Sequence, residues 1–172
     1  FADLPSPLDG IFASDASNDA LGVFIKLPAD PSPLVSAFPL LPNWRSSLEG
    51  YIGNAEAWAV EMLVETLVNM GARSNTLTLL CDNTNVVDGW SRGWSPNALN
   101  NAAFARLFDA AEKYDLAFNI EYVSTHDNPA DEISRLKIPE GAVVLQPPLA
   151  PSPPVGTQGG PPPFAVSCYF SA

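Results

Sequence analysis

The chain has 172 residues, which is enough for one domain with its own hydrophobic core. Its 8 basic and 19 acidic residues give a formal net charge of −11, which argues against a free-standing nucleic-acid-binding protein with a basic face. Neither a membrane-spanning apolar stretch nor a signal-peptide pattern is evident. The two cysteines, Cys81 and Cys168, suggest neither a disulfide scaffold nor a zinc site. We therefore expect an intracellular, reducing location, cytoplasmic or nuclear, and no membrane partner.

Both ends of the chain are rich in Pro and Gly and show no periodicity, as is typical of extended, weakly packed segments. Residues 1–9 are expected to be a linker from an upstream region, and residues 137–172 a C-terminal tail. This leaves a compact domain at residues 10–136. Because the sequence begins with Phe1 rather than Met, we expect a piece of a longer polypeptide.

The first half of this domain predicts two or three strands followed by a helix. Residues 10–17 and 20–27 are short, apolar and β-prone, with Ser, Asn and Asp between them, and they predict a hairpin. A third, irregular strand is expected around Leu34–Phe38, within a Pro-rich segment. Residues 54–71 predict a long helix that ends at Gly71.

The second half alternates strands with helices. Strands are predicted at residues 76–82 and 116–123, and a short helical turn at residues 84–93. Ser95-Pro96 predicts the start of a second long helix, with Ser as N-cap and Pro at the first helical position. A last short helix is expected near Asn128-Pro129. This order predicts an α/β fold with a mixed sheet covered by helices.

Two aspartates lie at strand positions where a carboxylate needs an explanation. Asp15 interrupts an apolar strand and has small neighbours, and burying it is costly unless a partner or a metal neutralises it. Alternatively, Asp15 already belongs to a turn that it caps. Asp82 ends a buried strand, where ligands of such sheets tend to bind, and it could equally act as the N-cap of the following turn.

The first long helix carries three glutamates, of which one is unusual. Glu56 lies on the same face as the apolar residues, whereas Glu61 and Glu65 lie about 140° and 180° away, on the expected solvent side. A glutamate on a buried face indicates a function. The alternative is that Glu56 lies in the first helical turn, where the helix dipole favours an acid.

The segment "STHDNPADEISR" (124–135) holds the only histidine of the chain. Asp131 would fall in the first turn of the short helix and could point back toward the sheet. Asp127 is expected to act as a cap or to face solvent. His126 alone is more often a hydrogen-bonded polar residue than a catalyst.

Four segments together resemble a known family. They are "FASDAS" (12–17), "NAEAWA" (54–59), "LLCDNTNVV" (79–87) and "STHDNPADEISR" (124–135). In this order and spacing they resemble the ribonuclease H domain that follows reverse transcriptase in LTR- or DIRS-like retroelements and hepadnavirus-like elements. The ending "NPAD" followed two residues later by "SR" is the most specific of the four, and the resemblance covers about residues 10–136.

The resemblance implies a ribonuclease H-like fold with a mixed five-stranded sheet flanked by helices. It also implies two divalent cations, usually Mg²⁺ with Mn²⁺ possible, which suit oxygen ligands. Matched by motif position, the metal ligands would be Asp15, Glu56, Asp82 and Asp131. His126 would match a mobile histidine that assists proton transfer or product release.

The implied activity is hydrolysis of the RNA strand of an RNA–DNA hybrid, recognised by its 2′-hydroxyl groups and groove shape. Expected substrate contacts are Asn18, Asn83, Asn85 and Arg135. Because the chain has no basic extension to grip the hybrid, we expect the upstream reverse transcriptase domain of the same polypeptide as partner. Two alternatives stay open: an inactive ribonuclease H-like interaction or scaffold domain, and a DNA nuclease on the same fold.

Overall fold

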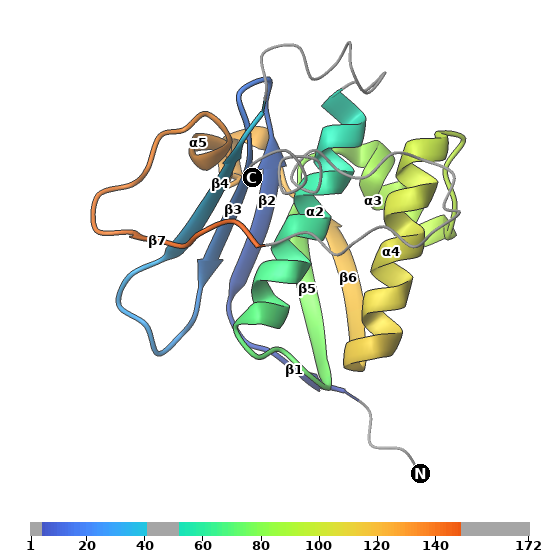
Figure 1. Ribbon diagram of the computed structural model, residues 1–172, viewed down its shortest axis with the longest axis horizontal. Helices are drawn as coiled ribbons and strands as arrows, with labels where there is room; N and C mark the ends of the chain where they lie inside the picture. The colour runs from blue at the N-terminus through green and yellow to red at the C-terminus, as the bar shows by residue number, and fades with distance from the viewer. Residues whose placement is uncertain (1–4, 41–51, 149–172) are drawn as a thin grey trace, which may run out of the picture.

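One mixed sheet organises the protein (Figure 1). The structure, a computed structural model, describes residues 5–40 and 52–148. The main strands are β2 (Ile11–Ala16), β3 (Ala20–Lys26), β4 (Leu34–Pro39), β5 (Asn75–Cys81) and β6 (Leu116–Tyr122). They lie in the order β4–β3–β2–β5–β6. Strand β3 is antiparallel to both β2 and β4, whereas β5 is parallel to β2 and β6 is parallel to β5.

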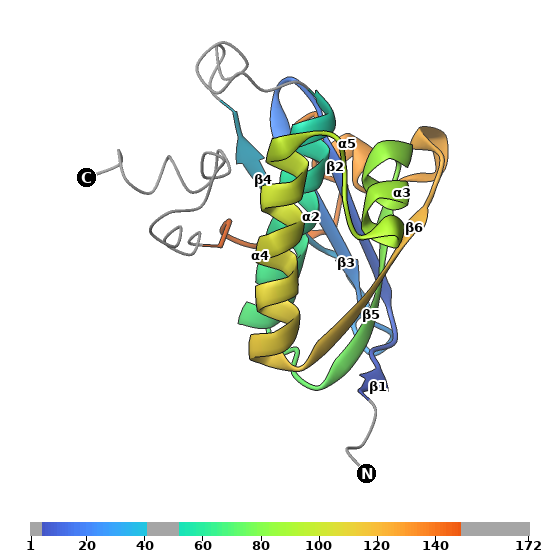
Figure 2. The same cartoon turned by 90° about the vertical axis from the view of Figure 1, so that its right-hand side faces the viewer.

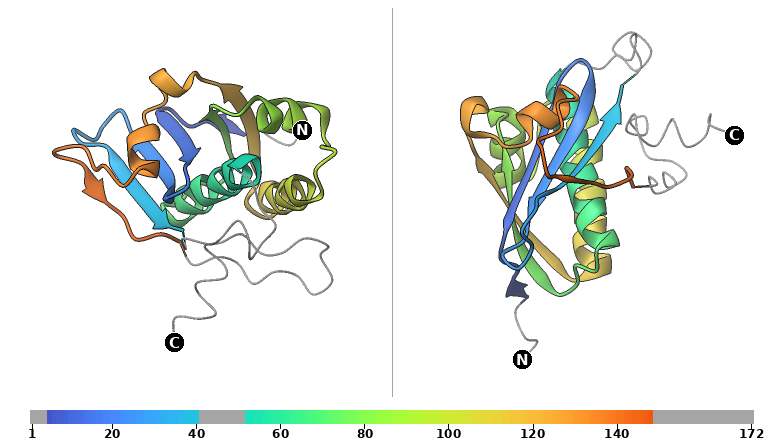
Figure 3. Two further views of the ribbon diagram at one scale, coloured as in Figure 1. Left: turned by 90° about the horizontal axis from the view of Figure 1, so that it is seen from above. Right: turned by 90° about the vertical axis from the view of Figure 1, so that its left-hand side faces the viewer.

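Helices cover the two faces of this sheet unequally. The long helices α2 (Ile52–Asn69) and α4 (Ala98–Tyr114) lie side by side on one face, and the single-turn helix α5 (Asp131–Ser134) lies on the other (Figures 2 and 3). Helix α3 (Thr84–Arg92) packs near β6, and a 3-10 turn, η1 (Thr125–Asp127), leads into α5. In the described part of the chain, no helix has the length and apolar composition needed to cross a bilayer.

The strands and helices predicted for the compact domain are confirmed, including the irregular strand, which is β4. Two short strands lie outside the range of 10–136. Strand β1 (Ser6–Pro7) pairs in parallel with β5, and β7 (Val143–Val144) pairs in parallel with β4. Of the predicted linker and tail, residues 1–4 and 149–172 lie outside the described residues.

The close approach of α5 to the sheet depends on a glycine in β3. Gly22 pairs with Asp15 across the hairpin, and a Cβ at position 22 would lie 2.5 Å from the backbone nitrogen of Ser134. Because real side chains do not pack this closely, only glycine lets the backbone of α5 rest directly on β3. The last residue of α5 is thereby placed beside Asp15.

Helix α2 is buried on more than one face, which corrects the prediction for Glu61. The expectation that Glu61 faces solvent is wrong: its side chain is buried, because α4 packs beside α2 and covers the flank of α2 that carries Glu61. Glu61 Oε1 and Oε2 accept hydrogen bonds from Arg106 Nε at 2.5 Å and Nη2 at 3.2 Å. Glu65 is half-buried.

The second long helix begins two residues later than predicted. Asn97, not Ser95, is the N-cap of α4, and its side chain accepts a hydrogen bond from the backbone nitrogen of Asn100 at 3.0 Å. Asn and Ser are about equally good N-caps, so local sequence does not distinguish them. Ser95 instead accepts a hydrogen bond from the backbone nitrogen of Asn97.

Replacing Arg106 by Met is expected to lower the free energy of unfolding by about 3–5 kcal/mol, because Glu61 would be left buried without its counter-charge. Burial raises the pKa of Glu61 to about 7, with Arg106 opposing the rise. The protonated carboxyl costs less to bury, so the loss should be larger at about pH 8 than at about pH 5. Urea denaturation at the two pH values measures both effects.

The control for this change is the double variant Glu61→Leu with Arg106→Met, which removes both charges. Apolar replacement of a buried ion pair is often neutral or stabilising, so this variant should recover most of the lost stability. A loss that is equally large in the double variant would contradict the assignment to an uncompensated charge.

Candidate metal centre

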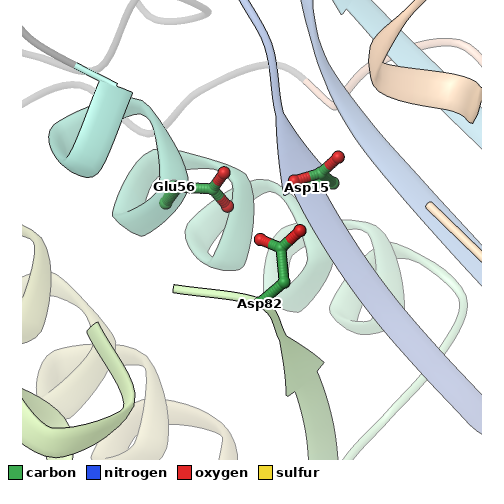
Figure 4. A group of neighbouring side chains, drawn as sticks. All are labelled: Asp15, Glu56 and Asp82. Carbon is green, nitrogen blue, oxygen red and sulfur yellow. The ribbon is translucent and has the colours of Figure 1, made fainter. Parts of the chain in front are cut away.

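Three acidic side chains from three elements converge at the carboxyl ends of β2 and β5 (Figure 4). Asp15 comes from β2, Glu56 from α2, and Asp82 directly follows β5. One carboxylate oxygen from each lies within 4.8 Å of the others. The sequence predicted these three residues as ligands of one site, and the structure brings them together.

The parallel register of β2 and β5 explains how two of the acids meet. Ala13 pairs with Leu80, so the residues two positions further on, Asp15 and Asp82, lie side by side where the strands end. Asp15 lies within β2 rather than in the turn, so the alternative of a turn cap does not hold. The N-cap of α3 is Asn83, which leaves the carboxylate of Asp82 free of that role.

Glu56 reaches the cluster from above the sheet. Helix α2 begins at Ile52, so Glu56 lies beyond the first turn and its position is not explained by the helix dipole. Its side chain is only 5% exposed, and its Oε2 atom is buried without a hydrogen-bond partner among the described residues. A buried carboxylate oxygen of this kind needs a proton or a cation beside it.

The cluster is electrostatically unfavourable for three negative charges. Burial and the nearby Asp82 raise the pKa of Asp15 to about 7, although hydrogen bonds with Glu56, Ser134 and the backbone of Ala16 oppose the rise. Burial, followed by the charges of Asp15 and Asp82, raises the pKa of Glu56 to about 10. Two strongly shifted acids beside a third at one site are typical of a functional centre.

The donor set fits a hard divalent cation such as Mg²⁺ or Mn²⁺. All three donors are carboxylates, which these cations prefer over nitrogen or sulfur ligands. A cation would also offset the mutual repulsion of the acids and satisfy the buried Oε2 atom of Glu56. The residues present therefore fit the cation that the sequence resemblance implied.

Asp131, the predicted fourth ligand, is not part of the three-carboxylate cluster. Its Oδ1 accepts a hydrogen bond from Arg135 Nε at 3.3 Å, one turn along the chain. A guanidinium group stabilises this carboxylate, whereas approach to three further acids would add repulsion. Asp131 as a metal ligand stays a prediction.

The predicted histidine lies near Asp131. His126 is exposed on η1 and lines an open pocket of about 770 Å³ together with Asp131. Its predicted role in proton transfer or product release stays a prediction. Asp127 is exposed, as expected, and its backbone nitrogen donates to Ser124 Oγ.

The predicted substrate contacts lie on segments that adjoin the cluster. Asn18 is exposed in the turn after β2, and Asn85 is exposed in the first turn of α3. Asn83 is half-buried, and its Oδ1 accepts a hydrogen bond from the backbone nitrogen of Val86 at 3.1 Å. Arg135 is exposed and pairs with Asp131. Contacts of these four residues with a substrate stay predictions.

Sequence reasoning missed the direct neighbour of Asp15 on α5, which is Ser134. The Ser134 hydroxyl donates to Asp15 Oδ2 at 2.9 Å. A sequence signal was present, because Ser134 is part of the "SR" pair in the most specific motif. No local pattern, however, shows which of Asp131 and Ser134 faces Asp15.

Comparison with known proteins identifies the fold. No protein-family model and no curated protein sequence matches the chain. Ribonuclease H1 from the halophilic archaeon Halobacterium salinarum is similar in structure, with a TM-score of 0.55 and 16% identity over 72% of this chain and 92% of that chain. LC11 ribonuclease H1, solved in complex with an RNA/DNA hybrid, has a TM-score of 0.57 and 15% identity over 76% and 96%. The chain has a ribonuclease H-like α/β fold.

Proposed function

We propose that the chain is an endoribonuclease that hydrolyses the RNA strand of RNA–DNA hybrids with two divalent cations. The observation that carries this proposal is the buried cluster of Asp15, Glu56 and Asp82 at the strand ends of a ribonuclease H-like sheet. The fold alone would not suffice, because many chemistries share one fold. A set of acids that burial and repulsion destabilise is best explained by cation binding at this position.

Asp15, Glu56 and Asp82 would hold the cations through carboxylate oxygens, and Asp131 is proposed as a further ligand. Bound divalent cations supply an activated water and stabilisation of the leaving 3′ oxygen of a phosphodiester. The burial of Asp15 and Glu56 keeps bulk water from their oxygens, which strengthens electrostatic interactions at the site. His126 is proposed to carry a proton or to assist product release.

Substrate recognition is proposed to involve Asn18, Asn83, Asn85 and Arg135. These residues follow the ends of β2, β5 and α5 or begin α3, on segments that adjoin the carboxylates in sequence. Asn side chains can donate to and accept from 2′-hydroxyl groups, which distinguish RNA from DNA. LC11 ribonuclease H1, a protein of similar fold, was solved in complex with an RNA/DNA hybrid, which supports the proposed substrate class.

The net negative charge of the chain favours a partner domain that binds the nucleic acid. With a formal net charge of −11, the isolated chain is expected to bind hybrids weakly and with strong salt dependence. We propose that an upstream reverse transcriptase domain in the same polypeptide holds most of the nucleic acid. This chain would then supply the cleavage site.

The first test is cleavage of a labelled RNA–DNA hybrid at low salt with Mg²⁺ or Mn²⁺. Asp82→Asn is expected to lower the cleavage rate by more than about 100-fold. Losing a group that only hydrogen-bonds to a metal ligand typically costs about 10–100-fold in activity, and losing the ligand itself should cost more. Asp88→Asn, an exposed aspartate on α3, is the matched control and should cleave like the parent. Double-stranded DNA and RNA in parallel reactions test the substrate class.

The outcomes separate the proposed function from its alternatives. Loss of the RNA strand of the hybrid alone, abolished in Asp82→Asn, supports the ribonuclease. Loss of a DNA duplex instead would identify a DNA nuclease. If nothing is cleaved, the assay is repeated with the upstream region attached. Continued inactivity of that longer protein would favour the scaffold and contradict the proposal.

A second prediction concerns the stability of the metal-free protein. In the unfolded chain Asp15 and Glu56 release their protons near pH 4, whereas in the folded state their pKa values are raised to about 7 and about 10. Between about pH 4 and the raised pKa values, the unfolded state therefore binds fewer protons than the folded state. The free energy of unfolding consequently falls as the pH rises above about 4. Thermal unfolding with a chelator should give a lower Tm at about pH 8 than at about pH 5.

Added Mg²⁺ should raise the Tm more at the higher pH, because a bound cation stabilises the ionised carboxylates. Glu56→Gln removes one of the acids, so this variant should lose less stability with rising pH and gain less from Mg²⁺. An equal gain from Mg²⁺ in Glu56→Gln and the parent would exclude the cluster as the binding site.

A further inference from the structure

Ser134 occupies a fully buried position between α5 and the carboxylate cluster. Its side chain is 0% exposed, and its Oγ lies 2.9 Å from Asp15 Oδ2 and 2.7 Å from the backbone oxygen of Asp131. Among the described side chains outside the cluster, Ser134 is the hydrogen-bond donor to Asp15. A hydrogen bond from a hydroxyl to an ionised carboxylate is stronger than one to a neutral carbonyl. When Asp15 is ionised, as it would be beside a bound cation, it is therefore the favoured acceptor.

The backbone of Ser134 is held in place independently of its hydroxyl. Gly22 allows the Ser134 nitrogen to lie directly against β3, and Ser17 Oγ donates to the Ser134 carbonyl oxygen at 2.5 Å. At the start of this segment, Asn128 Nδ2 donates to the carbonyl oxygen of Ser14 at 3.0 Å. These contacts join α5 to β2 and β3 at both ends, so the Ser134 hydroxyl is presented to Asp15 in a fixed position.

Fixing one oxygen of Asp15 has a consequence for the other. A carboxylate rotates about its last side-chain bond, and this terminal torsion is broad in the absence of a partner. A hydrogen bond at Oδ2 restricts this rotation and sets the direction of the lone pairs that remain for a ligand. Groups that orient metal ligands in this way typically change metal affinity or activity by 10–100-fold when they are removed.

We propose that Ser134 is a positioning residue that orients Asp15 for binding a divalent cation. The proposal rests on the proposed metal-dependent function and names the residue of α5 that serves it. The competing role is purely structural, in which the hydroxyl only satisfies the Asp131 carbonyl within α5. The two roles differ in what the loss of the hydroxyl changes: cation affinity in the first case and folding stability alone in the second.

The test compares Ser134→Ala with Ser14→Ala by titration with Mn²⁺, following the free ion by electron paramagnetic resonance. Ser134→Ala is expected to bind Mn²⁺ about 10–100-fold more weakly than the parent. Ser14 is the matched control, since it adjoins Asp15 in sequence and is equally buried, and its Oγ has no hydrogen-bond partner among the described residues. Ser14→Ala keeps the carbonyl that Asn128 contacts and should bind Mn²⁺ like the parent.

Two further measurements separate positioning from folding. The free energy of unfolding of Ser134→Ala without metal gives the structural cost of the change. In the cleavage assay, Ser134→Ala should need about 10–100-fold more Mg²⁺ for half-maximal rate, with an unchanged KM for the hybrid and a kcat that recovers at saturating Mg²⁺. A structural defect alone would not be reversed by more Mg²⁺ at a temperature where the variant is folded.

Each outcome has a distinct meaning. Mn²⁺ affinity equal to the parent's in folded Ser134→Ala overturns the positioning role while leaving the proposed function intact. If Ser134→Ala does not fold, Ser134→Cys keeps the shape with a weaker donor. This variant should bind Mn²⁺ several-fold more weakly than the parent, and parent-like binding overturns the proposal. If the parent binds no Mn²⁺ and cleaves no hybrid even with the upstream region attached, the proposed function fails and the role of Ser134 fails with it.

Discussion

The parallel pairing of β2 with β5 is the constraint on which the candidate site depends. Because Ala13 lies opposite Leu80, the chain must place Asp15 and Asp82 next to each other at the end of the two strands. Glu56 is contributed by α2, the helix that connects β4 to β5. Two of these acids have strongly raised pKa values because of burial and mutual repulsion. The fold thus holds these acids in an electrostatically unfavourable arrangement, which is typical of sites that bind a cation or transfer a proton.

The two faces of the sheet contribute differently to this site. On one face α2 and α4 form the core, and the Glu61–Arg106 ion pair joins these helices about 1.4 turns beyond Glu56. On the other face α5 is too short to bury much surface, and its position depends on Gly22 and on hydrogen bonds from Ser17 and Asn128. The core face therefore provides rigidity, and the α5 face provides direct contact with Asp15.

Local periodicity predicted the strands and helices well, because each long segment has one dominant apolar pattern. It also identified Glu56, which shares a face with apolar residues of α2. The same reasoning failed for Glu61, since it assumed one buried face and could not include the second face that α4 covers. The start of α4 was misplaced because Asn97 and Ser95 are both good caps. The positions of Asp131 and Ser134 relative to Asp15 depend on how a single turn docks on β3, which no sequence period encodes.

The long sequence separations within the carboxylate cluster have a kinetic consequence. Its members come from a hairpin, a crossover helix and the strand that follows, so the three oxygens meet only after the parallel β2–β5 pairing has formed. Parallel pairing across a crossover is a slow, non-local step in folding. A cation held by all three residues would therefore join the chain after this step and would act mainly by slowing unfolding rather than by speeding folding. On this view, a cation bound at this centre indicates that the sheet is complete, and a partly folded chain would not carry the assembled carboxylate cluster.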